Sequence, residues 1–412
     1  MRLTDVRGYA LSSPIDPVQE RRFHAGTRYL KKRDVVLLVV ETADGRRGYA
    51  PSGASSSAMR EYFEGDTQET FADVLEDVVA PELEGVSLSS PAELHDELVD
   101  LELPNRLRTR AASAFDVAFH DLLGKEAGAP IATLLADRWE TDPSTELPLY
   151  ASAGMYMEPA GYVEQASILA DLGFVGYKYR PGIGPDGDRE ILERLAAEVD
   201  VPSMIDAHTW WKMGERAYGM ETIRSLVEHA GEHDAYWVEE PVEPDDYDGY
   251  RTLAETGTPL AGGESEPDHD GLCALAETGG VAFLQGDVRH HLGYTGCLEA
   301  NECARKSNCT FVPHNFGTWL GTVANAHLVA AVPDADVLEY PVFEDDPALG
   351  IGATGGMYPF ELAFDVIEET LEVDAGRMTV PDGPGLGVTV DADVIDRYPY
   401  VEGPWTEFEY DE

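Results

Sequence analysis

Two patterns of apolar and polar residues divide the chain. The first third begins with strand-like runs such as 34–42, and an Asp44-Gly45 turn leads into another run. Apolar residues then recur at helical spacing in 69–79, 91–100 and 110–128. Strands followed by helices predict an α+β domain in this part of the chain.

After about residue 148, short apolar strands alternate with amphipathic helices. The strands are expected at 175–179, 202–206, 235–239, 260–262, 283–287, 310–312 and 337–338. This alternation predicts parallel strands and an α/β fold. The number of units favours a (β/α)8 TIM barrel over an open sheet, which would more often carry a glycine-rich nucleotide loop.

The length of 412 residues suits one large barrel and a smaller domain. We expect an N-terminal α+β domain in 1–125 and the barrel, with the active site, in 126–370. The proline- and acid-rich segment 371–412 is expected to pack back on the N-terminal domain.

The net charge of −49 comes from 78 acidic and 29 basic residues that are dispersed along the chain. We interpret this charge as a solvated coat suited to a halophile's salty cytoplasm, because molar salt shortens the Debye length to ~3 Å. Nucleic acid is excluded as a partner since no basic face is expected. No signal peptide or membrane span is expected, so the prediction is a soluble, cytoplasmic protein.

The cysteines are Cys273, Cys297, Cys303 and Cys309, with no CxxC pair. Buried free thiols in a reducing cytosol are a better interpretation than a zinc site.

Polar residues follow the predicted strands at intervals near the ~30 residues of a βαβ unit. They are Lys178, Arg180, Asp206, His208, Glu239, Glu264, Asp287, His314 and Glu339. The regular spacing predicts that they meet at one mouth of the barrel, where active sites of this fold lie. Clustered carboxylates need a cation between them, and oxygen ligands without thiolates favour Mg²⁺ over zinc. The alternative is that each acid is merely solvated or paired.

The motifs themselves are similar to those of the enolase superfamily, mandelate racemase subgroup. They are MID (204–206), VEEP (238–241), GGES (262–265), GD (286–287), VPHN (312–315) and LEYP (338–341). The resemblance spans nearly the whole chain. It implies a modified, enolase-like TIM barrel, an N-terminal capping domain completed by the C-terminal tail, one Mg²⁺ per subunit, and a homo-oligomer from dimer to octamer.

The resemblance also implies roles for individual residues. Asp206, Glu239 and Glu264 match the metal ligands, and Glu240 is expected to support them. The catalytic His–Asp dyad matches His314 and Asp287, with His314 as the base. Glu339 matches the acid that binds the substrate carboxylate opposite the metal.

Two departures narrow the chemistry. Arg180 stands where the subgroup usually has a basic lysine, and arginine stays protonated, which argues against a base on each face of the substrate. Lys178 could instead serve as the base on the opposite face. His208 resembles the general acid of galactonate dehydratases, and strand alternation should point it into the same cavity as Asp206. The alternative for His208 is a hydrogen-bond donor beside the metal.

Substrate contacts are expected from loops 21–29 and 52–60, with Arg22, His24 and Tyr29 in the first, and from Asn315. The alternative is a solvated loop. Together these features predict a lyase, a Mg²⁺-dependent hydro-lyase that converts a sugar acid (aldonate) into its 2-keto-3-deoxy acid. A racemase, epimerase or cycloisomerase of the same superfamily, or a non-catalytic binding or regulatory relative, remains an alternative.

Overall fold

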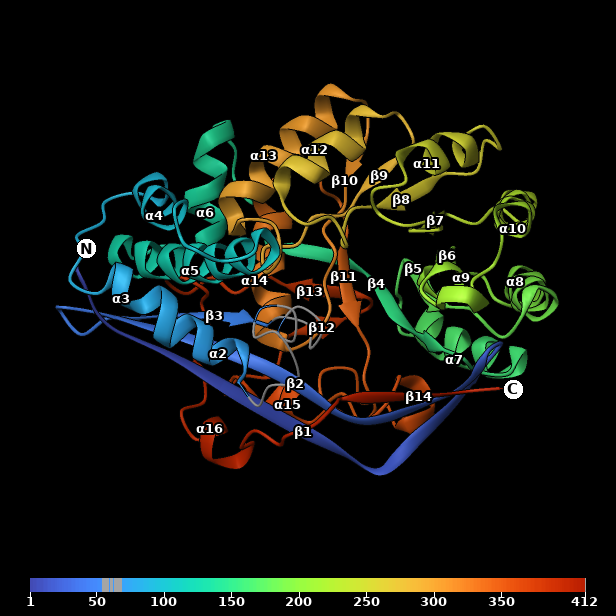
Figure 1. Cartoon of the computed structure of the whole chain (residues 1–412), viewed down its shortest axis with the longest axis horizontal. Coiled ribbons are helices and arrows are strands. Elements are labelled where there is room, and N and C mark those ends of the chain that lie inside the picture. Colours follow the sequence, from blue (N-terminus) through green and yellow to red (C-terminus); the bar gives the residue numbers. More distant parts are fainter. Residues whose placement is uncertain (54–58, 60–61, 63–68, 412) are drawn as a thin grey trace.

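The computed structural model describes residues 1–53, 59, 62 and 69–411. An antiparallel sheet spans the N-terminal part, with β1 (Leu3–Phe23) paired along its length to β2 (Gly26–Thr42). The other edge of β2 takes β3 (Arg47–Ser52) at one end and β14 (Thr406–Tyr410) at the other. Figure 1 shows this sheet lying beneath the rest of the molecule, with the red C-terminal strand beside the blue ones.

Helices of the N-terminal part pack on this sheet or on one another. They are α2 (Phe71–Val74), the π-helix η1 (Leu75–Val79), α3 (Ala80–Leu83), α4 (Pro91–Leu98), α5 (Asn105–Ala127), α6 (Ile131–Ala136) and the 3-10 turn η2 (Asp137–Trp139). The long helix α5 packs on β3 through alanines and phenylalanines buried along its length. It ends at Gly128, which adopts the left-handed conformation that favours glycine (φ 68°).

Within the described residues, eight parallel strands form the barrel. In spatial order they are β10 (Thr310–Phe311), β9 (Phe283–Leu284), β8 (Leu260–Gly262), β7 (Trp237–Glu239), β6 (Ser203–Asp206), β5 (Gly176–Arg180), β4 (Glu146–Met155) and β11 (Leu338–Pro341). The pattern of the sequence missed β4 and overestimated β9. The predicted α/β fold, a TIM barrel with an α+β capping domain, is confirmed.

Helices surround these strands (Figure 1). The long ones are α7 (Pro159–Asp171), α8 (Pro185–Glu198), α10 (Met220–Glu232), α11 (Tyr247–Ala254), α12 (His269–Glu277), α13 (Gly293–Lys306) and α14 (Trp319–Ala331). Short elements are α9 (His208–Trp211), η3 (Gly214–Arg216), η4 (Ala353–Gly355), α15 (Leu362–Asp365) and α16 (Val394–Arg397). No helix in the described ranges is both long and apolar enough to cross a bilayer.

The C-terminal segment divides between the two parts of the molecule. Strands β12 (Val373–Asp374) and β13 (Arg377–Thr379) extend the barrel sheet beside β4, whereas β14 joins the capping sheet. Helix α5 runs across the boundary expected at residue 125. The three-part division of the chain stays a prediction.

The prediction of four free thiols is wrong for two of them. Cys273 on α12 and Cys303 on α13 form a disulfide across the packed helices, with their Cα atoms 5.3 Å apart, whereas Cys297 and Cys309 are free and buried. Spacing along the sequence carries no sign of this contact, because it depends on how the two helices pack.

Candidate active site

Acidic residues from adjacent strand ends meet at the barrel mouth. Asp206 ends β6 and Glu239 ends β7, and the parallel register places them opposite each other. Glu264 follows β8 by two residues. The side chains of Asp206 and Glu239 are fully buried because the apolar strands that carry them are core strands on both faces.

Lys178 of β5 lies between two of these carboxylates. Its Nζ is 2.8 Å from Glu239 Oε1 and 2.6 Å from Glu339 Oε1, and its side chain is 1% exposed. Burial alone would lower the lysine pKa, but Glu239 and Glu339 raise it above its usual value. In this structure Lys178 is therefore a protonated cross-link between the two carboxylates.

Arg180, two residues further along β5, pairs with Asp206. Its Nε lies 2.9 Å from Asp206 Oδ2, and its guanidinium lies 5.1 Å from the centre of the Phe316 ring. Burial opposes ionisation of Asp206, but Arg180 and then His208 lower its pKa well below the usual range. The site holds Asp206 as a carboxylate.

His208 lies beside Asp206 as predicted, but strand alternation is not the reason. The strand β6 ends at Asp206, and His208 is the first residue of α9. Its Nδ1 lies 2.6 Å from Asp206 Oδ1, and its Nε2 lies 2.5 Å from Glu240 Oε2 and 3.1 Å from Glu264 Oε1. Burial and Lys212 lower the pKa of His208, but three carboxylates raise it well above 6.5.

His314 and Asp287 form the expected pair, with His314 Nδ1 2.9 Å from Asp287 Oδ2. The other imidazole nitrogen, Nε2, is 2.8 Å from Glu264 Oε2. Burial lowers the pKa of His314, but Glu264 and the hydrogen bonds to Asp287 and Glu264 raise it to about 10. Arg289 donates from Nε to Asp287 Oδ1 over 3.0 Å and thereby holds the aspartate in place.

Glu339 of β11 is the last of the predicted charged residues at the barrel mouth. Its Oε2 accepts hydrogen bonds from the Asn315 backbone N–H (2.9 Å) and the Tyr150 hydroxyl (3.1 Å). The Asn315 amide donates to the Glu339 carbonyl (3.0 Å) and to Thr322 Oγ1 (2.9 Å). The contacts of Asn315 thus position Glu339, and they leave no side-chain donor pointing freely to a substrate.

The predicted substrate residues of the capping hairpin lie apart from the carboxylates. Arg22 pairs with Asp411, and the Tyr29 hydroxyl donates to Glu409 of β14 over 2.8 Å. His24 approaches the mouth more closely, since its Nδ1 is 3.1 Å from the carbonyl of Gly182, just beyond β5. Most of the predicted loop 52–60 lies outside the described residues.

Two arginines that the sequence did not single out, the buried Arg28 and the half-buried Arg33, lie between the hairpin and the mouth. Arg28 is 9% exposed, and its guanidinium lies 5.0 Å from the Trp405 ring. The guanidinium of Arg33 lies 4.5 Å from the same ring and 5.2 Å from Phe316, which Arg180 also contacts. Within the described parts of the chain neither arginine forms an ion pair, although acids outnumber bases by 78 to 29.

Other missed residues position the catalytic candidates. Gln285 donates to Glu239 Oε2 over 2.7 Å, and Arg289 holds Asp287. Both stand two residues from Asp287 in the sequence, which is the signal that could have revealed them. Tyr150 could not be found this way, because its strand, β4, was not recognised.

The residues at the mouth fit a divalent cation. Asp206 Oδ2 and Glu264 Oε2 are buried carboxylate oxygens that face Arg180 and His314 as ion-pair partners. One donor atom from each of His208, Glu240 and Glu264 lies within 4.8 Å of the others. Burial and the neighbouring carboxylates, outweighing Lys178, raise the pKa of Glu239 to about 7. This excess of negative charge and the oxygen-rich donor set suit Mg²⁺.

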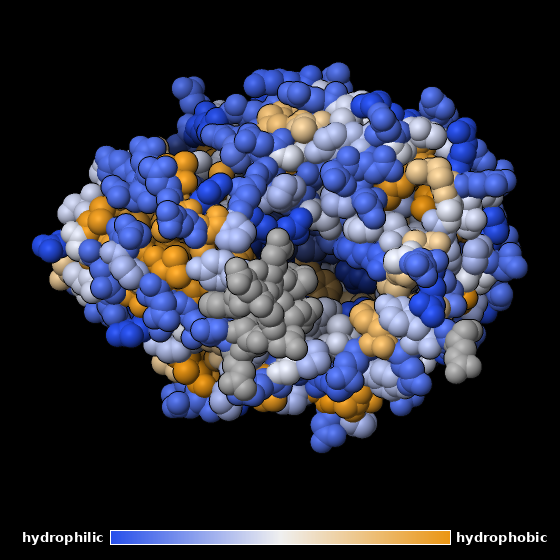
Figure 2. Space-filling view, viewed as in Figure 1, coloured by the Kyte–Doolittle hydropathy of each residue, from blue (hydrophilic) through white to orange (hydrophobic). Residues whose placement is uncertain are grey.

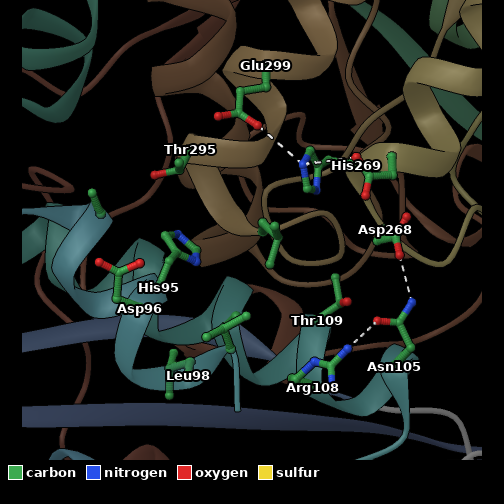
Figure 3. A pocket seen from close by; sticks show the side chains of 15 residues that line it. His95, Asp96, Leu98, Asn105, Arg108, Thr109, Asp268, His269, Thr295 and Glu299 are labelled. Atoms are coloured by element: carbon green, nitrogen blue, oxygen red, sulfur yellow. Dashed lines mark hydrogen bonds and ion pairs between the residues drawn. The ribbon is translucent and has the colours of Figure 1, made fainter. Parts of the chain in front are cut away.

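Figure 2 shows a largely hydrophilic face that is hollowed near its centre. A separate cavity of about 460 Å³ lies between α4, α5, α12 and α13 (Figure 3). Its lining includes His95, Arg108, His269 and Glu299 and none of the predicted site residues.

Comparison with known families identifies the chain. Residues 161–394 match the enolase C-terminal domain-like family, and residues 13–136 match the N-terminal domain of mandelate racemase and muconate lactonizing enzyme. The chain belongs to the enolase superfamily, in the mandelate racemase subgroup. The resemblance that the motifs carried is therefore confirmed.

Curated relatives are similar over most of the chain. A D-galactarolactone cycloisomerase from Agrobacterium fabrum is 27% identical, covering 97% of this chain and 99% of the relative. An arabinonate dehydratase from Saccharolobus solfataricus is 25% identical, covering 96% and 99%. A D-xylonate dehydratase from Haloferax volcanii is 24% identical, covering 71% and 70%. These matches confirm the prediction of an enzyme of the lyase class.

Solved structures show the same fold. A 3,6-anhydro-D-galactonate cycloisomerase from Zobellia galactanivorans superposes with a TM-score of 0.76 at 24% identity, covering 97% of this chain and 99% of that one. A racemase from Streptomyces coelicolor with bound magnesium gives 0.74 at 21% identity, covering 96% and 99%.

Proposed function

We propose that this enzyme is a Mg²⁺-dependent sugar acid dehydratase, which removes the C2 proton of an aldonate and expels its 3-hydroxyl. The observation that carries the proposal is the pair of imidazoles on one carboxylate. His208 Nε2 and His314 Nε2 approach the two oxygens of Glu264 at 3.1 and 2.8 Å. Elimination of water needs one group to take a proton and another to give one, and this pair supplies both.

The division of labour follows from the partners of each imidazole. His314, oriented by Asp287, takes the proton from C2. His208, held between Asp206 and Glu240, gives a proton to the departing 3-hydroxyl, so that water leaves and the resulting enol becomes the 2-keto-3-deoxy acid. Magnesium, held by Asp206, Glu239 and Glu264, supplies Lewis-acid stabilisation of the enediolate charge.

The protonation state of His314 depends on Glu264. The charge of Glu264 helps raise the pKa of His314 to about 10, so the imidazole is cationic at neutral pH in this structure. Any positive charge that offsets Glu264 lowers that pKa toward the range in which the imidazole can act as a base.

The substrate is proposed to be anionic and polyhydroxylated. Arg28 and Arg33 support this, since both lie near the mouth without an acidic partner among the described residues. Glu339 and Lys178 face the position expected for the substrate carboxylate. Among the predicted substrate residues, Arg22, Tyr29 and the Asn315 side chain have partners within the protein. His24 lies beside the end of β5, and its two ring nitrogens contact the carbonyls of Gly182 and Arg216. A homo-oligomeric state remains part of the prediction.

A cycloisomerase is the second candidate, because the relative covering 97% of this chain carries that name. The same base and acid would serve, with a lactone ring oxygen as the leaving group. Two-base racemisation is less well supported, since Lys178 is locked between Glu239 and Glu339.

The test is a panel of aldonates and sugar lactones with Mg²⁺ in molar KCl, followed by mass spectrometry. A dehydratase yields a 2-keto product lighter than its substrate by one water, whereas a cycloisomerase yields a 2-keto acid of unchanged mass. Exchange of the C2 hydrogen for solvent deuterium with no new carbonyl would indicate a racemase or epimerase. No turnover or exchange with any acid would contradict the proposal.

A further inference from the structure

A second cluster of metal-binding side chains lies outside the barrel mouth, on the outer helices α8 and α10. His229 lies in the last turn of α10 and His233 is the residue that caps the end of this helix, and their ring centres are 4.6 Å apart. Glu193 of α8 faces them, and one donor atom from each of the three residues lies within 4.8 Å of the others. Figure 1 shows α8 and α10 next to each other at the edge of the barrel, and their residues are in contact.

We propose that His229, His233 and Glu193 form a binding site for a borderline divalent cation of the zinc type. His229 Nε2 is buried yet has no hydrogen bond among the described residues. It lies 3.4 Å from Glu193 Oε1, an approach that is not aligned as a hydrogen bond. Two ligands of a tetrahedral zinc ion with bonds of about 2.0–2.1 Å are themselves about 3.4 Å apart.

The donor set separates this site from the barrel mouth. Two imidazoles and one carboxylate suit zinc, cobalt or nickel, whereas Mg²⁺ prefers oxygen ligands in octahedral geometry. Glu193 is 53% exposed on its side chain, so water can complete the coordination. Glu232, whose Oε2 is 3.7 Å from His229 Nδ1, lies close to the other edge of that imidazole and can orient it.

The proposed ion would join two helices behind the active site. Helix α8 follows the strand that carries Lys178 and Arg180, and α10 comes after the strand and short helix that carry Asp206 and His208. A ligand that binds only the folded state stabilises it. The site therefore predicts stabilisation by zinc that does not depend on the reaction at the mouth.

The test is a zinc titration by calorimetry on the whole enzyme, with the mouth first saturated with Mg²⁺. The wild type should bind one equivalent that His233→Gln binds at least about tenfold more weakly. Glu193→Gln should weaken binding in the same direction. Matched controls are Glu190→Gln, an exposed acid of α8 outside the cluster, and His269→Gln, an imidazole without a second imidazole beside it. Both control variants should still bind one equivalent of zinc with the affinity of the wild type.

Cobalt gives an independent readout. Wild-type protein should show the visible absorption of a low-symmetry cobalt site, and His233→Gln should lose it. Zinc should raise the unfolding midpoint of the wild type by several degrees and leave that of His233→Gln unchanged, with Mg²⁺-dependent turnover equal in both. Equal affinity for zinc in wild type and His233→Gln, or binding of Mg²⁺ in place of zinc at these residues, would overturn the proposal.

Discussion

The barrel mouth and the hairpin of the capping sheet both carry charged residues, but their surroundings differ. Lys178 is 1% exposed between two buried carboxylates, whereas Arg22 and its partner Asp411 are 63% and 51% exposed. Charges in a buried environment interact strongly, and water and salt screen exposed pairs. The same residue types are therefore expected to control catalysis and stability in one region and to have little effect in the other.

The largest effect is expected at His314, the proposed base. Replacing His314 by Asn, which keeps the size but removes the titrating group, should lower kcat by about 10²–10⁴-fold. Product formation from the best acid of the panel measures this loss. Isothermal titration with Mg²⁺ is the control, since the proposed ligands Asp206, Glu239 and Glu264 remain. Unchanged turnover would place the base elsewhere.

His208 should separate the two halves of the reaction. In His208→Asn, elimination should fall by about 10²-fold or more, because the leaving hydroxyl has lost its proton donor. Exchange of the C2 hydrogen with solvent should persist, since His314 and Asp287 are intact. Deuterium incorporation measured beside product formation checks the difference. Parallel loss of both would favour the alternative in which His208 only supports the metal ligands.

The same contrast explains what the sequence could predict. Asp206, Glu239 and His314 follow core strands at regular intervals, so their convergence follows from the barrel repeat. Each is in fact joined by contacts below 3.3 Å to another predicted site residue. The periodicity of the sequence is sufficient to predict which residues meet when a regular repeat of strands and helices positions them.

Contacts that depend on irregular or long-range packing were not predictable. The pairing of Arg22 with Asp411 joins residues 389 positions apart, through a C-terminal strand that the sequence pattern did not reveal. The disulfide between Cys273 and Cys303 depends on the packing of two helices. The geometry of His208 required knowing that β6 ends at Asp206.

Replacing Lys178 shows how much more a buried ion pair contributes to the free energy of unfolding than an exposed one. Lys178→Met leaves Glu239 and Glu339 facing each other without a cation, which should lower the free energy of unfolding by about 3–5 kcal/mol. The matched control is Lys31→Met, since Lys31 pairs with Glu407 on the exposed capping sheet, and such pairs contribute about 0–1 kcal/mol. Urea unfolding of both variants in EDTA measures the difference. Equal losses would show that burial does not distinguish the two pairs.

His314 should also make the stability of the metal-free protein depend on pH. Its pKa rises from 6.5 to about 10 on folding, so protonated His314 stabilises the fold fully below about pH 6.5. That contribution is lost as the pH rises through about 10. Urea unfolding in EDTA should show the wild type losing a few kcal/mol more than His314→Asn between pH 6.5 and 10.5. Parallel curves for the two proteins would show that the imidazole is not charged at neutral pH.

The smallest effect is expected at the hairpin. Arg22→Ala removes an exposed ion pair with Asp411, so kcat/KM should stay within about twofold of the wild type. Arg33→Gln is the informative comparison, because Arg33 is packed against Trp405 and Phe316 beside the mouth, and its loss should raise KM for an anionic substrate. Steady-state kinetics at low and at molar KCl measure both variants. A large rise in KM for Arg22→Ala would mean that the hairpin rearranges to contact substrate, and the distinction between a buried, functional mouth and a solvated hairpin would no longer hold.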